Sequence, residues 1–149
     1  VSAGPKAILD IPKTLEVLET RGVPVVGYGT DTVPAFWSRQ SPCPAPLRLD
    51  SPEAIAEFQR TRNALGIPGG MLIANPLPRE AEIPSAEMET HIAQAEADAA
   101  AAGIGGKALT PFLLERILEL TGGRSLKTNI ELVKNNARLA ARIAVALAS

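Results

Sequence analysis

Apolar positions along the chain fall either in short continuous runs or at helical spacing. Two runs, residues 23–28 and 71–76, are short and bounded by glycine or proline, which predicts buried strands. A third strand is predicted at residues 1–3. Residues 29–49 are rich in proline, which predicts a long irregular connection. The adjacent aromatic residues Phe36 and Trp37 indicate that this connection packs against the rest of the protein.

Helical spacing and end signals predict five helices. Pro12 suits the first turn of the first helix and Gly22 its left-handed end. Ser51 is predicted to cap the second helix, and Thr110 and Ser125 to cap the last two. The predicted helices are residues 7–20, 52–65, 85–102, 112–121 and 125–148, and the last carries Leu126, Ile130, Val133, Ala137, Ala140 and Ala144.

Strands separated by helices indicate an α/β fold with parallel pairing and right-handed crossovers. A parallel sheet needs helices on both faces and more than two or three strands. We therefore expect the chain to form part of an α/β domain whose remaining strands lie elsewhere, and not to form a stable monomer alone. The start at Val1, without an initiator Met, fits a fragment or a processed chain.

Length and charge narrow the function classes. The 149 residues are about one domain, and 46% of them are hydrophobic, as in an ordinary globular core. Lys plus Arg is 15 and Asp plus Glu is 16, giving a net charge of −1. This balance leaves no basic footprint for a nucleic acid or an anionic membrane. No apolar run is long enough for a membrane span and no signal-peptide pattern is present, so we expect a cytoplasmic location.

Cysteine and histidine are too scarce for several kinds of chemistry. Cys43 is the single cysteine, which excludes an internal disulfide and a cysteine-rich zinc site. His91 is the single histidine, so a histidine metal cluster cannot form within the chain. A serine triad would have to use His91, and no nucleophile elbow is present. We expect Cys43 to be inert and His91 to be solvated or at an interface.

Four side chains are candidates for chemistry. Lys6 follows the predicted strand 1–3 and precedes a helix, a position where α/β folds place reactive groups. A lysine amine can form an imine with a carbonyl substrate, although spacing alone favours a solvated surface lysine. Asn129, Asn135 and Asn136 lie in a predicted helix, where asparagine is a poor former. They either face a ligand, or form a polar helix face or a side-chain bond to a neighbouring loop, and the second, structural alternative is favoured.

Two glycine pairs and one strand end remain open to more than one interpretation. Gly69–Gly70 and Gly105–Gly106 could admit a phosphate, but neither has dinucleotide or Walker spacing, so turns are favoured. Asn75 ends a predicted strand before a proline, where it could face a substrate or form a structural turn.

Several blocks carry a family resemblance in their order along the chain. VSAGPKAILDI is followed by LETRGVPVVGYGTDTVPAFW, LRLDSPEAIAEF, GGMLIANPLP, GKALTPFLLERILELTGGRSL and TNIELVKNNARLA. Together they resemble the pseudouridine-5′-phosphate glycosidases, a family that includes the indigoidine-synthase-A-like proteins. The resemblance covers nearly the whole chain, and it implies that residues 1–149 are the C-terminal part of one such domain.

The resemblance implies a fold and an activity. The fold is an α/β/α sandwich around a mostly parallel or mixed sheet, assembled as a homotrimer. The activity is reversible cleavage of the C–C glycosidic bond of pseudouridine 5′-phosphate, giving uracil and ribose 5-phosphate through a lysine imine. Such a bond has no leaving-group oxygen or nitrogen to protonate, so the paired-carboxylate route of ordinary glycosidases does not transfer simply.

The resemblance also assigns residues. Lys6 matches the lysine that forms the imine with C1′ of the opened ribose, and Asn129 matches a substrate-contacting asparagine. The family's general-acid glutamate, manganese-binding aspartate and phosphate-binding lysine precede the lysine motif. Mn²⁺ is therefore expected to be held by the remaining N-terminal half, with no metal ligand from this chain. Pro5 departs from the small or aliphatic residue usual before the lysine.

Two alternatives stay open beside this function. The first is a related sugar-phosphate lyase or a relative with a role in a pigment pathway. The second is a non-catalytic half-domain chain, because half of the expected site is not in this sequence. A substrate screen separates the first alternative from the glycosidase, and the presence of the other half separates the second.

Overall fold

A parallel β-sheet lies at the centre of the computed structural model, which describes residues Val1–Ser149. Its strands are β1 (Val25–Tyr28), β2 (Leu47–Leu49) and β3 (Leu72–Ala74), in the order β2-β1-β3. The strands predicted within residues 23–28 and 71–76 are therefore confirmed, and so is their parallel pairing.

The third strand is not the predicted one. Residues 1–3 contribute a single parallel bridge, in which the Ser2 amide donates to Ile73 at 2.9 Å and the Asn75 amide to Ser2 at 2.7 Å. The third strand is β2, inside residues 29–49, for which the sequence predicts an irregular connection throughout. It has three residues, and both Leu47 and Arg48 are exposed, so it lacks the buried pattern that announces a strand.

The five predicted helices are confirmed. The first starts later than predicted, because Asp10 accepts a hydrogen bond from the Lys13 amide and caps the helix there. Residues 7–9 form a turn instead. The helices are α1 (Ile11–Thr20), α2 (Pro52–Ala64), α3 (Ser85–Ala101), α4 (Leu109–Leu120) and α5 (Arg124–Ala148), with short 3₁₀ turns η1 (Arg79–Ala81) and η2 (Gly106–Ala108).

Of the three side chains predicted to cap helix starts, one is confirmed and two are wrong. Ser51 accepts a hydrogen bond from the Ala54 amide at 3.1 Å, as predicted. Thr110 and Ser125 are not caps, because both lie inside the first turns of α4 and α5. The caps there are Ala108 and Gly123, neither of which has a capping side chain. The sequence signal therefore places these two helix starts too late.

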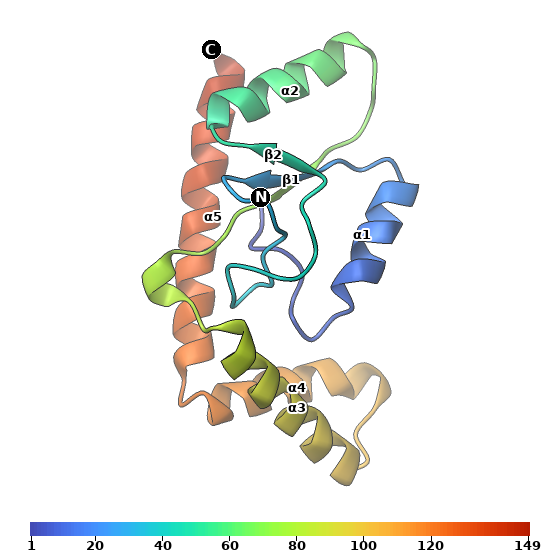
Figure 1. Ribbon diagram of the computed structural model, residues 1–149, viewed down its shortest axis with the longest axis vertical. Helices are drawn as coiled ribbons and strands as arrows, with labels where there is room; N and C mark the ends of the chain where they lie inside the picture. The colour runs from blue at the N-terminus through green and yellow to red at the C-terminus, as the bar shows by residue number, and fades with distance from the viewer.

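Helices cover both faces of the sheet, which confirms the α/β/α arrangement (Figure 1). Side chains alternate between the faces of a strand. Val25 and Ala74 pack in the cluster that includes Leu15 of α1. Val26 and Ile73 point the other way, and that cluster includes residues of α2 and α5. The sheet therefore holds α1 on one side and the α2–α5 pair on the other.

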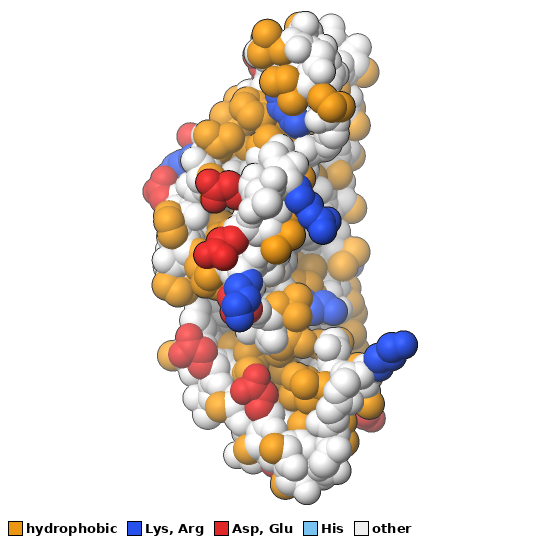
Figure 2. Space-filling model, turned by 90° about the vertical axis from the view of Figure 1, so that its right-hand side faces the viewer, with side chains coloured by type: hydrophobic (Ala, Val, Ile, Leu, Met, Phe, Trp, Pro, Cys, Tyr) orange, Lys and Arg blue, Asp and Glu red, His pale blue; other side chains and the backbone are white.

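A third apolar cluster joins α3 and α4 to the turn that carries Trp37. Trp37 is buried, so the packed state predicted for the aromatic pair is confirmed. From the side of α1, charges of both signs are interspersed, and apolar side chains gather in the recess above the α3–α4 pair (Figure 2). Phe36, Trp37 and Leu114 of this cluster also line a cavity that includes Lys6.

The long helix α5 runs along one side of the molecule (Figure 1). One of its faces is buried through residues such as Leu132, Leu139 and Ile143. The apolar residues that the sequence marked on this helix are on another face and are exposed. None of the helices combines the length and the apolar character that crossing a bilayer requires.

Candidate active site

A tight bend delivers Lys6 from the edge of the sheet. Ser2 is held by its bridge to β3, and Ala3 is buried with its carbonyl accepting from the Phe36 amide at 2.9 Å. Gly4 follows with φ +85°, and a Cβ atom there would lie 1.8 Å from the Pro34 carbonyl oxygen. Only glycine fits both this conformation and this close approach, so the backbone before Lys6 is fixed.

Lys6 itself lies in the turn between this bend and α1, and it is partly buried. It lines a cavity of about 180 Å³. Asn129, on the second turn of α5, lines the same cavity. The structure thus brings together the two residues that the sequence singled out for catalysis and substrate binding, although 123 positions separate them along the chain (129 − 6).

The aromatic pair forms one wall of the cavity. Phe36 has φ +64°, which is unusual for a bulky residue, in a tight turn where the Ala35 amide donates to Ser38. The Phe36 and Trp37 rings meet edge to face, with centroids 5.1 Å apart. The Trp37 indole donates to the Ser125 carbonyl at 3.3 Å, which ties this wall to the start of α5.

The rest of the lining comes from Leu114 and Leu118 of α4 and from Ser125 and Leu126 of α5. Sequence reasoning missed these residues and the aromatic pair as lining residues. The pair was visible as an adjacent Phe-Trp in a long loop, but the leucines have no signal that separates them from core residues. An apolar cavity with a few convergent polar groups is the usual form of a small-molecule site.

The other asparagine candidates have structural roles. The side-chain amide of Asn75 donates to the side-chain oxygen of Asn136 at 3.0 Å, and the side-chain amide of Asn135 donates to the Pro76 carbonyl at 3.1 Å. These bonds hold the end of β3 against α5. The favoured alternative for Asn135 and Asn136, bonding to a neighbouring loop, is the one that the structure shows.

Other candidates lie away from the cavity. His91 faces Glu87 on α3 at 3.6 Å, and Cys43 is buried in the loop before β2. The Gly69–Gly70 pair belongs to a turn, where the buried Arg62 guanidinium donates to the Gly70 carbonyl at 3.1 Å. This supports the turn interpretation of that pair.

The ionisable groups whose pKa values are shifted also lie outside the cavity. The Arg116 guanidinium, 2.6 Å from Asp98, holds the pKa of that carboxyl below its usual value, with help from Gln94. The pKa of Arg48 is raised by its hydrogen bonds to Asp50 and Asp31. No group of three or more His, Cys, Asp or Glu side chains is arranged to hold a metal ion.

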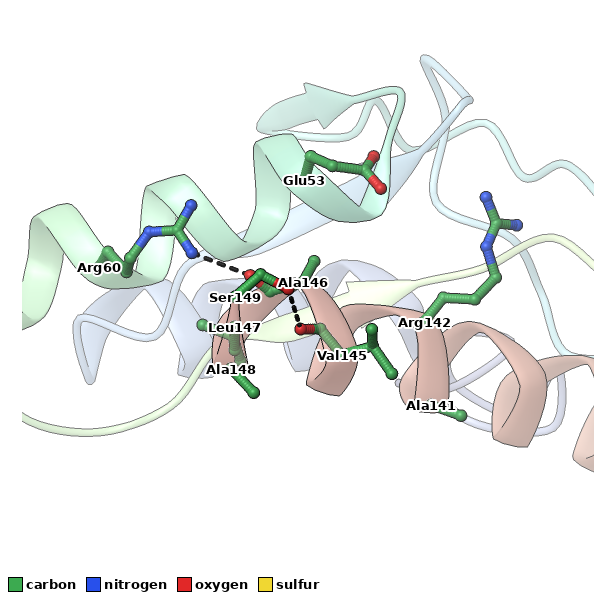
Figure 3. Close-up of a pocket in the computed structure, with 9 residues that line it drawn as sticks. All are labelled: Glu53, Arg60, Ala141, Arg142, Val145, Ala146, Leu147, Ala148 and Ser149. Atoms are coloured by element: carbon green, nitrogen blue, oxygen red, sulfur yellow. Dashed lines mark hydrogen bonds between the residues drawn. The ribbon is translucent and has the colours of Figure 1, made fainter.

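Larger hollows lie elsewhere on the protein and do not include Lys6. One, of about 860 Å³, lies between α2 and the end of α5, with Arg60 and Arg142 on either side of it (Figure 3). Arg60 is already engaged, because it donates to the Ala146 carbonyl at 2.9 Å. Another, of about 410 Å³, is polar and includes Arg39 and Arg48. Neither of these two shares a residue with the Lys6 cavity.

Comparison with known proteins shows which family the chain resembles. The model of the family described as indigoidine synthase A like protein matches residues 1–146. The chain is 69% identical over 147 residues to a pseudouridine-5′-phosphate glycosidase of Methylobacterium nodulans, covering 99% of this chain and 44% of that protein. It is 69% identical to the glycosidase of Mesorhizobium japonicum, covering 48% of it. The chain therefore spans about half the length of the curated relatives it matches.

Two solved structures have the same fold. The prealnumycin C-glycosynthase AlnA, solved in complex with ribulose 5-phosphate, is 35% identical, with a TM-score of 0.91. An indigoidine synthase A-like protein from Thermotoga maritima is 36% identical, with a TM-score of 0.84. The likeness covers 99% and 98% of this chain and 48% of each of those chains.

Proposed function

The chain belongs to the family of indigoidine synthase A like proteins, and we propose that it supplies the lysine-bearing half of a pseudouridine-5′-phosphate glycosidase. The observation that carries this proposal is the meeting of Lys6 and Asn129 in one mostly apolar cavity. The names of relatives up to 69% identical over nearly the whole chain support it.

In the proposed reaction the Lys6 amine is the nucleophile. It attacks C1′ of the ribose and breaks the bond from C1′ to the ring oxygen, which takes a proton and becomes a hydroxyl of the opened sugar. Protonation of the uracil carbon then breaks the C–C bond, the amine lone pair supplies the electrons, and an iminium remains between Lys6 and C1′. Water hydrolyses this iminium and frees the lysine amine. The bend at Gly4 fixes the backbone from which the Lys6 side chain extends, and Phe36, Trp37 and Leu118 line the cavity around it. Uracil and ribose 5-phosphate are the products.

The other half of the relatives completes the site in this proposal. A general acid, Mn²⁺ and the groups that bind the phosphate would come from it, and the assembled protein would be a homotrimer in the cytoplasm. The residues of this chain do not fit the metal, because no carboxylate or histidine lines the Lys6 cavity. Accordingly, no step of the reaction above is assigned to the metal.

The proposed function is tested in a full-length chimera, in which this chain replaces the 147 matching residues of the M. nodulans glycosidase. We expect the chimera to release uracil from pseudouridine 5′-phosphate, and chromatography with absorbance detection measures this release. A folded chimera without turnover supports the non-catalytic alternative. Turnover of another C-linked sugar phosphate in place of pseudouridine 5′-phosphate supports the sugar-phosphate lyase.

Asn129 is expected to contribute to substrate binding. Its amide can donate and accept hydrogen bonds at the cavity wall, where an apolar neighbourhood leaves few polar partners. In the chimera, Asn129→Ala should raise KM about 5- to 30-fold, the equivalent of one lost hydrogen bond of about 1–2 kcal/mol. The change in kcat should be smaller. Steady-state kinetics with pseudouridine 5′-phosphate measures both constants.

Asn135→Ala is the matched control for this prediction. It removes an amide from the same helix, but one that donates to the Pro76 carbonyl and does not line the cavity. We expect it to lower the melting temperature and leave KM unchanged. If Asn135→Ala raises KM as much as Asn129→Ala does, the binding role of Asn129 is wrong.

A further inference from the structure

An apolar stripe runs along the exposed side of α5. It consists of Leu126, Ile130, Val133, Ala137, Ala140 and Ala144, which are separated by alternating steps of four and three residues. The large members are far from buried, with 51% of Leu126, 48% of Ile130 and 58% of Val133 exposed. Leu147 continues the spacing and is also exposed.

This pattern differs from the scattered apolar residues of an ordinary surface. Alternating steps of three and four keep side chains on one line of a helix, which is the spacing by which one helix packs along another. The alanines in the middle would let a neighbouring backbone approach closely, and the leucine, isoleucine and valine near the start of α5 would fill the wider space. A contiguous exposed apolar stripe of this kind marks a docking surface.

We propose that an α-helix packs against this stripe. The helix belongs to the polypeptide that corresponds to the other half of the relatives, the half that this chain does not match. The proposal deepens the proposed function, since it rests on the same missing half and states where that half docks. In the completed fold, α5 would lie between the sheet on its buried face and this helix on its stripe.

The size of the relatives argues for this occupant. This chain matches 44% and 48% of the two glycosidases named above, so a polypeptide of similar size completes their fold. The stripe is also continuous with the candidate site, because Leu126 lies in the stripe and lines the Lys6 cavity. A helix seated on the stripe would therefore reach the rim of that cavity, where the proposed function needs further residues.

Charge argues against a second copy of the same stripe as the occupant. Lys127, Lys134 and Arg138 border it along one side, and only Lys134 has an acidic partner within the chain, Glu131 at 2.9 Å. Two such stripes packed together would oppose like charges, which destabilises a helix pair. A partner helix with acidic residues along its edge would instead complement Lys127 and Arg138.

Cysteine labelling of the full-length chimera tests the proposal without relying on activity. In Val133→Cys the new thiol should be protected from a maleimide, whereas in Val17→Cys it should react rapidly. Val17 is the matched control because it is an exposed valine on α1, 50% exposed against 58% for Val133. We expect at least about a tenfold difference in rate, measured by intact mass. Equal rates would overturn the proposal, and the native Cys43 is replaced by serine in all variants.

A glutamate introduced into the stripe distinguishes the two possible occupants, a helix from the other half of the protein and a second copy of this chain. Val133→Glu in the chimera should lower the melting temperature well below that of Val17→Glu, with no change in the number of subunits by light scattering. A variant that keeps its melting temperature but loses subunits would show that another copy covers the stripe, and would overturn the proposal. Because neither readout uses turnover, an inactive chimera whose Val133→Cys thiol is protected contradicts the proposed function alone.

Discussion

Lys6→Arg is expected to abolish carbon–carbon cleavage in the chimera while leaving the protein folded. Arginine keeps a positive charge and a long side chain, but its guanidinium stays protonated and cannot form an imine. Loss of a covalent nucleophile should lower kcat by about a thousandfold or more. Uracil release measures the activity, and circular dichroism with thermal melting measures the fold.

Covalent trapping identifies the nucleophile directly. Borohydride reduction in the presence of ribose 5-phosphate should add the mass of the reduced sugar phosphate to the peptide that contains Lys6. This adduct should be absent in Lys6→Arg. An adduct on a different lysine, or near-normal turnover by Lys6→Arg, would make Lys6 an ordinary surface charge.

Lys13→Arg is the matched control for the same substitution. Lys13 is an exposed lysine that pairs with Asp10 at 3.0 Å at the start of α1, and it does not line the Lys6 cavity. Arginine can keep this ion pair, so activity and melting temperature should both stay near those of the parent chimera. A large loss of activity in Lys13→Arg would show that the reaction is sensitive to lysine substitutions in general.

The sequence predicted the elements that have strong local signals. β1 and β3 are continuous apolar runs, and α2 starts at a proline that follows a capping serine, so each could be placed from local patterning. β2 could not, because it is a three-residue strand at the edge of the sheet and gains its pairing from β1 alone. Its existence depends on tertiary contact, which a local pattern does not record.

The sequence singled out two residues of the candidate site but neither its other lining residues nor its shape. Lys6 and Asn129 stood out through the family resemblance, whereas local spacing favoured a surface role for Lys6. The cavity walls depend on how α4 and the Phe36–Trp37 turn pack against the start of α5. The apolar stripe of α5 shows the same limit. Its spacing is plain in the sequence, but only the packing shows that Leu132 and Leu139 face the interior instead.

Gly4→Ala is expected to destabilise the protein strongly and to displace Lys6. The backbone has φ +85° at Gly4, and the added methyl group would lie 1.8 Å from the Pro34 carbonyl oxygen. The left-handed conformation costs about 1–2 kcal/mol for alanine, and relieving the overlap adds to this cost. We expect the free energy of unfolding of the chimera to fall by about 3 kcal/mol or more, measured by denaturant titration. Activity should fall as well, because Lys6 follows this bend.

Gly22→Ala is the control that measures the cost of the left-handed backbone conformation without a steric overlap. Gly22, just after α1, also has a positive φ of +66°, but nothing lies within 4 Å of the position of an added Cβ. Its substitution should cost about 1 kcal/mol, from the left-handed conformation alone, and should leave turnover intact. The difference between the two variants then measures the contact between Gly4 and Pro34. If the two variants lose equal stability and both retain activity, the close approach at Gly4 does not position Lys6.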